Sequence, residues 1–227
     1  MIKLVADLAE VSCRDVGYLK IKCLYDSYCD DSGVLFWRQD SGAYLSLSGG
    51  NMIISRGAVC SDELFEFLNV ISPNNVFCPE ETAKKLKIKA YSAVNVMYRL
   101  GDISGETQGD GLSSGELYKL LNIPDFSLPP YPDFAVDWCR RLNRGYAEFY
   151  GIKEKCAAVS FNSGSYALIN GIVSKQKGCG KKALNAIIQK NRGKHILACC
   201  EDRLTGFYEK YGFKKLSKRF AIINEYK

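Results

Sequence analysis

Two glycines among lysines mark the stretch of this 227-residue chain whose residue types best suit ligand chemistry. Gly178 and Gly180 follow a strand-like apolar run and precede a helical pattern, so they are expected at a strand-to-helix turn. Such a turn leaves N–H groups free at a helix N-terminus, where the helix dipole favours an anion, and glycine lets the backbone approach a phosphate closely. The turn therefore predicts a polyphosphate ligand. The surrounding lysines are Lys175, Lys177, Lys181 and Lys182.

Three other interpretations of this turn have to be weighed. A Walker A loop requires Ser or Thr after Gly-Lys, and here a second lysine, Lys182, follows. The dinucleotide fingerprint accepts Ala183 as its third small residue and expects an acidic residue about 20 positions later, which Glu201 or Asp202 supplies. That interpretation stays open, as does a tight strand–helix connection without a ligand.

A second motif lies downstream of an expected strand at 195–200. It reads Tyr208-Glu-Lys-Tyr-Gly212-Phe213. Together the two motifs resemble the GNAT superfamily of acyl-CoA-dependent N-acyltransferases, whose loop is Arg/Gln-x-x-Gly-x-Gly/Ala and whose next helix ends in Tyr-x-x-x-Gly-Phe. Lys175 departs from the usual arginine or glutamine, and Glu201 stands where members often carry asparagine. The resemblance covers residues 134–225.

The resemblance implies acetyl-CoA as co-substrate and a site with two parts. The loop amides would hold the pyrophosphate of the cofactor, and the pantetheine arm would run beside the preceding strand where the sheet splays open. The binding residues are then Gln176, Lys177, Gly178, Cys179, Gly180 and Lys181 in the loop, with Ile172 and Val173 on the strand.

The resemblance also implies direct transfer of an acyl group, most often acetyl, to a primary amine. The departing thiolate needs a proton, and in the family this role falls to the motif tyrosine, here Tyr208. A packing role for Tyr208 is the alternative. Glu201 is the candidate general base, with a water chain to solvent as the alternative, and Asp202 is expected to cap the following helix.

Ten cysteines and one histidine are a further source of chemistry. The cysteines are scattered without a Cys-x-x-Cys pair, which predicts reduced thiols in a cytoplasm and no metal site. A cysteine nucleophile needs a histidine partner, and His195 is expected at the far end of its strand from the splay. We therefore expect Cys199 and Cys200 in the core and Cys179 close to the ligand.

Charge is unevenly distributed along the chain. Residues 133–227 carry a net charge of +11 and the preceding residues carry −5, within a total of +6. A basic C-terminal half suits an anionic ligand. The chain has neither an Arg-rich run nor an RNA-binding signature, and neither a signal-peptide core nor an apolar run of membrane-spanning length. We therefore expect no nucleic-acid partner and no membrane, and a cytoplasmic location.

The expected elements alternate between strands and helices, and their order repeats. The fold class that follows is α+β, with two tandem GNAT-like halves, each a mostly antiparallel sheet flanked by helices. Expected strands are 34–39, 43–47, 51–55, 75–78, 88–100, 156–161, 166–173, 195–200 and 214–223. Expected helices lie within 1–32 and at 61–71, 79–86, 116–122, 133–150 and 203–211. A further helix is expected directly after the glycine turn.

The repeat divides the chain into a degenerate N-terminal domain at 1–100, a linker at 101–132 and an acyl-CoA-binding domain at 133–227. At the place of the glycine loop, the first half carries Ser55–Glu63, with one glycine and two carboxylates at the helix start. Like charge would repel a pyrophosphate there, so we expect that the N-terminal half binds no CoA. The linker is either a plain tether or part of the acceptor cleft.

The predicted activity is therefore acetyl transfer to an amine, and the acceptor is a small-molecule or peptide amine. A non-catalytic CoA-binding regulatory module is the rival, favoured by the lack of a convincing base. A nucleotide-binding protein is the third possibility.

Overall fold

The computed structural model describes residues 1–5, 7–8, 15–102, 109–124, 126, 128–224 and 226, apart from the side chains of residues 217 and 218. Two compact units emerge. Unit 1 contains residues 1–97 and 199–227, and unit 2 contains residues 98–198. Within the described ranges, no helix combines the length and apolarity that crossing a bilayer requires.

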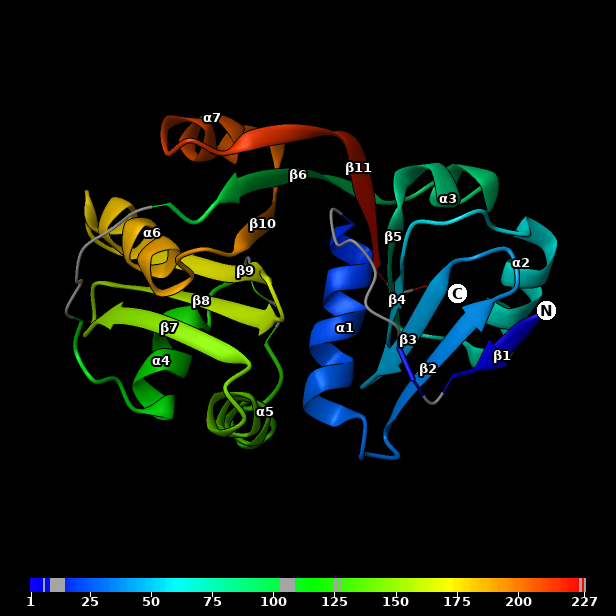
Figure 1. The fold of residues 1–227 in the computed structure, drawn as a ribbon, viewed down its shortest axis with the longest axis horizontal. Helices are drawn as coiled ribbons and strands as arrows, with labels where there is room; N and C mark the ends of the chain where they lie inside the picture. Colours follow the sequence, from blue (N-terminus) through cyan, green and yellow to red (C-terminus); the bar gives the residue numbers. More distant parts are fainter. Residues whose placement is uncertain are drawn as a thin grey trace. The chain divides into compact units, whose positions relative to one another are not determined.

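Unit 1 is a sheet with helices on both faces (Figure 1). Its strands follow the order β1-β2-β3-β4-β5-β11-β6. The pairs β1–β2, β2–β3, β3–β4 and β5–β11 are antiparallel, and β4 pairs with β5 in parallel. The strands are β1 (Ile2–Leu4), β2 (Val34–Gln39), β3 (Tyr44–Ser48), β4 (Asn51–Ile54), β5 (Asn75–Pro79), β6 (Ser92–Leu100) and β11 (Lys214–Asn224). The helices are α1 (Val16–Tyr28), α2 (Ser61–Ile71), α3 (Glu80–Lys85) and α7 (Asp202–Lys210).

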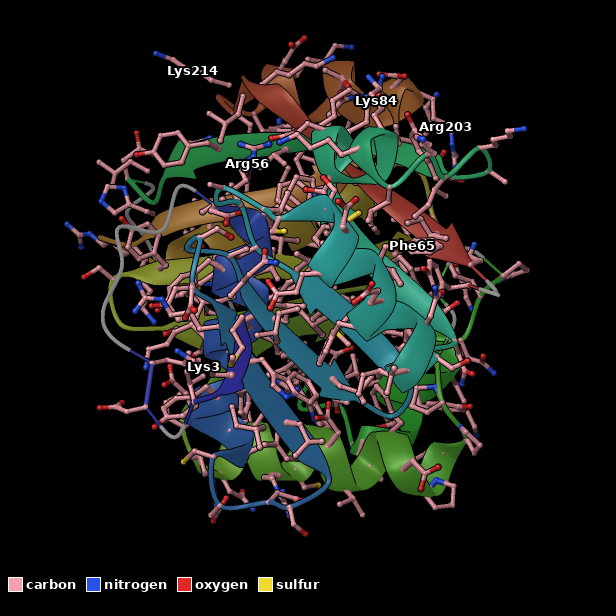
Figure 2. The ribbon with its side chains drawn as sticks, turned by 90° about the vertical axis from the view of Figure 1, so that its right-hand side faces the viewer. Lys3, Arg56, Phe65, Lys84, Arg203 and Lys214 are labelled. Atoms are coloured by element: carbon pink, nitrogen blue, oxygen red, sulfur yellow. The ribbon has the colours of Figure 1, made fainter. Side chains whose placement is uncertain are left out.

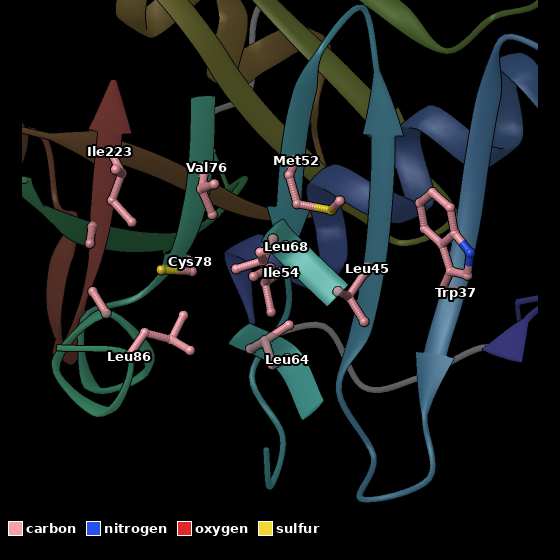
Figure 3. Packing of buried hydrophobic residues seen from close by; sticks show 12 residues of the cluster. Trp37, Leu45, Met52, Ile54, Leu64, Leu68, Val76, Cys78, Leu86 and Ile223 are labelled. Atoms are coloured by element: carbon pink, nitrogen blue, oxygen red, sulfur yellow. The ribbon is translucent and has the colours of Figure 1, made fainter. Parts of the chain in front are cut away.

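Alternating apolar residues explain how this sheet is buried. On β4, Met52 and Ile54 are 1% and 0% exposed and lie in the same core cluster as Leu64 and Leu68 of α2 (Figure 3). Residues one strand position apart point to opposite faces, so the other face of the sheet is left for α1. Charged side chains project outward from this unit, among them Lys84 on α3, Arg203 on α7 and Lys214 on β11 (Figure 2).

Unit 2 has the strand order β10-β9-β8-β7, with β9 and β10 parallel and the other pairs antiparallel. Two helices cover one face of the sheet and one helix covers the other (Figure 1). The strands are β7 (Ala147–Ile152), β8 (Cys156–Ser163), β9 (Tyr166–Ser174) and β10 (His195–Cys200). The paired helices are α4 (Ser114–Leu121) and α5 (Tyr131–Asn143), and α6 (Cys179–Lys190) lies opposite.

The mixed α/β class and the repeated element order are confirmed. From β2 to β6 the order is three strands, a helix, a strand, a helix and a strand, and the same order runs from β7 to β11. The segment 199–227 groups with the N-terminal residues, because β11 pairs with β5 from Phe220↔Pro79 to Asn224↔Asn75. The boundaries expected at residues 100 and 133 stay a prediction, since the compact units are not continuous stretches of sequence.

Three expected elements were wrong in part. The helix expected at 133–150 ends at Asn143, because Gly145 takes φ = +75° and the chain then enters β7. The N-terminal stretch expected to be helical contains β1, which pairs with β2. The strand expected from Ile88 begins at Ser92. Part of the expected loop at 101–115, residues 103–108, lies outside the described residues.

Candidate functional site

The predicted strand-to-helix turn is present. The last residue of β9 is Ser174, and α6 begins at Cys179 with Gly178 as its N-cap. Gly178 has φ = +85°, a conformation that L residues rarely adopt, which explains the glycine. The turn is closed by its own hydrogen bonds, since Ser174 Oγ donates to Gln176 O at 2.8 Å and Cys179 N–H donates to the same oxygen at 3.1 Å.

The start of α6 has the electrostatics of an anion site. Its N-cap is a glycine, so no side chain caps the first turn, and the first turn contains no acidic residue. N–H groups left without a cap at a helix N-terminus favour a negative charge. The lysines predicted to assist are all exposed. They are Lys175, Lys177, Lys181 and Lys182.

A hollow of about 350 Å³ lies beside the turn, next to Lys175. Lys119 and Lys153 also line it, together with the carboxylates of Glu116 and Glu154. Lys175 Nζ donates to the carbonyl oxygen of Lys119 at 3.5 Å, so the α4 end of unit 2 and the turn are joined at this point. The lining of the hollow therefore carries three ammonium groups and two carboxylates, and Glu116 is paired with Lys153 at 2.8 Å.

The parallel pairing of β9 with β10 ends before β9 reaches the glycine turn. The ladder between β9 and β10 starts at Tyr166↔His195 and stops at Ile169↔Ala198, whereas β9 runs on to Ser174. Beyond the stop, Ile172 and Val173 pair with Ala158 and Ala157 of β8. A register shift between Val159 and Ser160 of β8 sits at the stop and leaves Asn170 without a partner in the β8 register. Beyond Ile169, β9 therefore has no parallel partner within the described part of unit 2, as the predicted splay requires.

Sequence reasoning missed one contact of this strand. The connection between α4 and α5 places the ring of Phe126 over Gly171, where a Cβ would lie 3.3 Å from the ring. Phe126 packs on the same core cluster as Val159 and Val173. A glycine inside a strand is the signal that would have indicated this close approach. The connection that was expected to be a tether or part of the acceptor cleft thus lies on the strand at the splay.

Tyr208 belongs to unit 1, whereas the glycine turn belongs to unit 2, so each is described in its own unit. Tyr208 is 7% exposed and packs edge-on against Phe207 and Phe213, with ring centroids 5.5 and 5.3 Å away. Burial raises the pKa of its hydroxyl above the ordinary value. The phenol therefore holds its proton at neutral pH, and its assignment as acid stays a prediction.

Helix α7 begins one residue earlier than expected. Glu201 is the N-cap and makes no side-chain capping hydrogen bond, and α7 begins at Asp202, so the capping role expected of Asp202 was wrong. The exposed carboxylate of Glu201 accepts from Arg203 Nε at 2.6 Å. Asp202 accepts from Asn95 Nδ2 at 2.8 Å, and this hydrogen bond, with Arg219 nearby, lowers the pKa of its carboxyl. Glu201 as general base stays a prediction.

Of the two cysteines on β10, Cys200 lies in the core as expected, whereas Cys199 is only partly buried. Cys200 is 4% exposed, and burial raises the pKa of the Cys199 thiol to about 11. Both thiols are therefore protonated at neutral pH, which argues against a nucleophile. His195 begins β10 as expected and shares a 2.8 Å hydrogen bond with Tyr98. The described residues contain no cluster of potential ligands that could hold a metal ion.

The counterpart of the glycine turn in unit 1 is occupied by the chain's own groups. The carboxylate of Asp15 accepts from Arg56 N–H at 2.6 Å and from Gly17 N–H at 3.0 Å. The first turn of α2 carries Asp62 and Glu63. Acidic side chains therefore stand where a phosphate would otherwise be bound, which supports the expectation that this half binds no CoA.

Comparison with known proteins bears on the fold. No family model and no curated protein sequence matches the chain. Solved structures do: a GCN5-related N-acetyltransferase from Sphaerobacter thermophilus is 12% identical, with a TM-score of 0.54 over 91% of this chain and 90% of that one. A tandem GNAT protein from the clavulanic acid biosynthesis pathway is 10% identical, with a TM-score of 0.51 over 86% and 83%. The chain has the GNAT fold.

The tandem relative also fits the repeated element order of this GNAT-fold chain. Another similar structure is that of a functionally unknown protein from Staphylococcus epidermidis ATCC 12228, which is 10% identical and has a TM-score of 0.52 over 82% of this chain and 92% of that one. At these identities the likeness establishes the fold, and the predicted site residues rest on their own geometry.

Proposed function

We propose that this protein is an acyl-CoA-dependent N-acyltransferase that moves an acetyl group from acetyl-CoA to a primary amine. The observation that carries the proposal is the combination, in unit 2, of a parallel strand pair that separates after Ile169↔Ala198 and a glycine-capped helix that begins next to it. A ligand with a polyphosphate and an extended amide-containing arm matches these two features.

The residues of this chain fit acetyl-CoA as follows. The loop amides of residues 176–181 bind the pyrophosphate, because their helix end carries positive partial charge. The backbone at Ile172 and Val173 hydrogen-bonds the amides of the pantetheine arm, since β10 has left this part of β9. The bound cofactor supplies an activated thioester, and the chain orients it against the amine.

Two side chains transfer protons in the proposed reaction. Tyr208 donates a proton to the departing thiolate, and its raised pKa means that it enters the reaction protonated. Glu201 accepts the proton of the amine, directly or through water, from an exposed position beside Arg203. The acceptor is a small-molecule or peptide amine, which the connection bearing Phe126 helps to select.

The assignment of the glycine turn as the cofactor site is tested by substituting two glycines. One lies in the turn and the other lies elsewhere in unit 2, and both have a similar positive φ. Gly178 and Gly193 have φ of +85° and +79°, and a Cβ at either position meets no atom within 4 Å. A side chain is strained to a similar degree at either φ, and aspartate is among the few L residues that visit this region, so Gly178→Asp and Gly193→Asp differ chiefly in where the new charge stands. Acetyl-CoA at 100 times its Kd stabilises a protein by about 2.7 kcal/mol. We expect a thermal shift for the wild type and Gly193→Asp, and none for Gly178→Asp.

Two results would count against the proposal. Absence of any shift in the wild type with acetyl-CoA means that the turn does not bind the cofactor. A shift with NAD and none with acetyl-CoA indicates the dinucleotide interpretation instead.

The enzyme is separated from a non-catalytic CoA-binding module by Tyr208→Phe. This variant keeps the ring packing of a buried residue and removes only the hydroxyl. With an amine substrate identified by thiol release, kcat is expected to fall about 100-fold while acetyl-CoA affinity is unchanged. Tyr211→Phe, on the same chain segment, is the matched control and retains kcat. Equal kcat in both variants would remove Tyr208 from the mechanism.

A further inference from the structure

Two cysteines meet beneath the glycine turn. Cys156 is the first residue of β8 and Cys179 is the first residue of α6. The β8–β9 register pairs Cys156 with Ser174, the residue that ends β9. The turn folds back over that point, because a Cβ on Gly180 would lie 3.4 Å from Ser174 Cβ. Residues 23 positions apart are therefore brought together at the predicted pyrophosphate site.

The two side chains are neighbouring free thiols. Both are buried, with Cys156 0% and Cys179 7% exposed, and the nearby Cys179 thiol adds to the rise that burial causes in the pKa of Cys156. Gln176 fixes the position of Cys179, since the Cys179 Sγ lies 3.9 Å from Gln176 Oε1 and the Cys179 N–H donates to Gln176 O. Neither thiol has a role in the proposed acyl transfer.

We propose that Cys156 and Cys179 form a reversible disulfide that switches off the anion site at the start of α6. The switching part of this inference rests on the proposed function, whereas formation of the bond rests only on the placement of the two thiols. The thiol pair is thus a redox modification site, and the oxidant is a low-molecular-weight disulfide.

The reaction balances as two thiol–disulfide exchanges. The thiolate of Cys179 attacks one sulfur of the small disulfide, forming a mixed disulfide and releasing one small thiolate, which takes up the proton that Cys179 lost. Cys156 then loses its proton and attacks the sulfur of Cys179, and the second small thiolate leaves with that proton. The two cysteines are oxidised by two electrons, and one small disulfide is reduced to two thiols.

The order of the two attacks follows from burial. Cys179 lies in the exposed turn and is the more accessible sulfur, so it meets the oxidant first. Burial raises the pKa of the Cys156 thiol and keeps it protonated, so it reacts slowly with an external oxidant. Its attack on Cys179 is favoured because it is intramolecular.

Bond formation would deform the turn. Sulfurs in a disulfide are about 2.05 Å apart, much closer than two thiols in contact. In the proposed switch Cys179 moves toward β8 and carries the adjacent N-cap, Gly178, with it. The Cys179 N–H already donates to Gln176 O, so the groups that would face a phosphate are those of Gly178 and of the residues after Cys179, and this movement removes their common direction.

The test uses the full chain and glutathione disulfide as the oxidant. After oxidation, remaining thiols are blocked with N-ethylmaleimide and peptides are mapped by mass spectrometry. We expect a Cys156–Cys179 cross-link that dithiothreitol reverses. Acetyl-CoA affinity is measured in parallel and is expected to fall at least tenfold on oxidation. Cys156→Ser should form no cross-link and should instead keep the mixed disulfide of glutathione with Cys179, whereas Cys139→Ser, an exposed cysteine on α5, should behave as the wild type.

Each part of the inference has an outcome that overturns it. N-ethylmaleimide on both Cys156 and Cys179 after oxidation excludes the disulfide. A cross-link with unchanged acetyl-CoA affinity excludes the switch. If the reduced wild type does not bind acetyl-CoA at all, the proposed function and the switch fall together, and the peptide map still decides whether the disulfide forms.

Discussion

The absence of one methyl group determines how closely α1 approaches the end of β4. A Cβ on Gly17 would stand 2.7 Å from Ile54 O and 2.9 Å from the ring of Phe220. The oxygen belongs to a buried strand and has little freedom to move. The same helix start is fixed by Asp15, whose carboxylate accepts the N–H groups of Gly17 and Arg56. Glycine is therefore required here by space, not by an unusual φ.

We expect Gly17→Ala to lower the free energy of unfolding by about 1–3 kcal/mol, because the added methyl group overpacks the junction. Gly206→Ala on α7 is the matched control, since a Cβ there meets no atom within 4 Å. In a helix this change is expected to stabilise by about 0.5–1 kcal/mol. Urea unfolding of both variants measures the difference. Equal effects at the two positions would contradict the packing argument.

At the scale of elements, α4 begins with a capping box that is tied to the β7–β8 turn. Ser113 Oγ accepts from Glu116 N–H at 3.3 Å, and Glu116 Oε2 accepts from Ser113 N–H at 3.0 Å. The other carboxylate oxygen lies 2.8 Å from Lys153 Nζ. The hydrogen bond with Lys153, followed by those with Ser113, lowers the pKa of Glu116 to about 2. The start of α4 is therefore coupled to the turn that borders the predicted anion site.

A carboxyl-detected NMR titration is expected to give Glu116 a pKa of about 2. Because the folded pKa lies below the ordinary value of 4.5, the stability that Glu116 contributes is fully present above about pH 4.5 and is lost as the pH falls toward 2. Lys153→Met removes the largest cause, so the pKa of Glu116 should rise in that variant. An ordinary pKa in the wild type would show that the capping box does not persist in solution.

The elements themselves were largely predictable, and the exceptions have physical reasons. α2 was expected at 61–71 and is found there, because its apolar residues repeat with helical period. β1 has only three residues and gains its structure by pairing with β2, which local sequence does not encode. Most of β7 was expected within the helix at 133–150, but Gly145, with its positive φ, separates α5 from this strand.

The candidate site was predictable to the extent that it is local. The glycine turn and its lysines follow from residues 174–182 alone, and the structure places them as expected. The contact of Phe126 with Gly171 and the meeting of Cys156 with Cys179 depend on strand register, so sequence periodicity could not reveal them. The role of Tyr208 comes from the family resemblance and that of Glu201 from its place at the end of β10, and kinetic measurements test both.

At the scale of the whole molecule, the last strand of the chain completes a unit built mostly from its first residues. Phe220 on β11 is 0% exposed and stacks on Phe77 of β5 with ring centroids 4.8 Å apart. The guanidinium of Arg56 lies 5.0 Å from the centre of the Phe220 ring. A fragment of residues 1–100 would lack this strand and expose the edge of β5. Binding tests on the N-terminal half therefore require the full chain.

Phe220→Ala tests this dependence. Removing a fully buried aromatic ring is expected to lower the free energy of unfolding by about 3–5 kcal/mol. Because β11 is hydrogen-bonded to β5, the amides of β5 should lose protection from hydrogen exchange, although they lie some 140 residues earlier in the chain. Leu204→Ala, on the exposed side of α7, is the control and should leave β5 protected. Loss of protection confined to residues 199–227 would mean that the N-terminal residues hold their sheet without the last strand, and that β11 is an addition to unit 1 instead of part of its core.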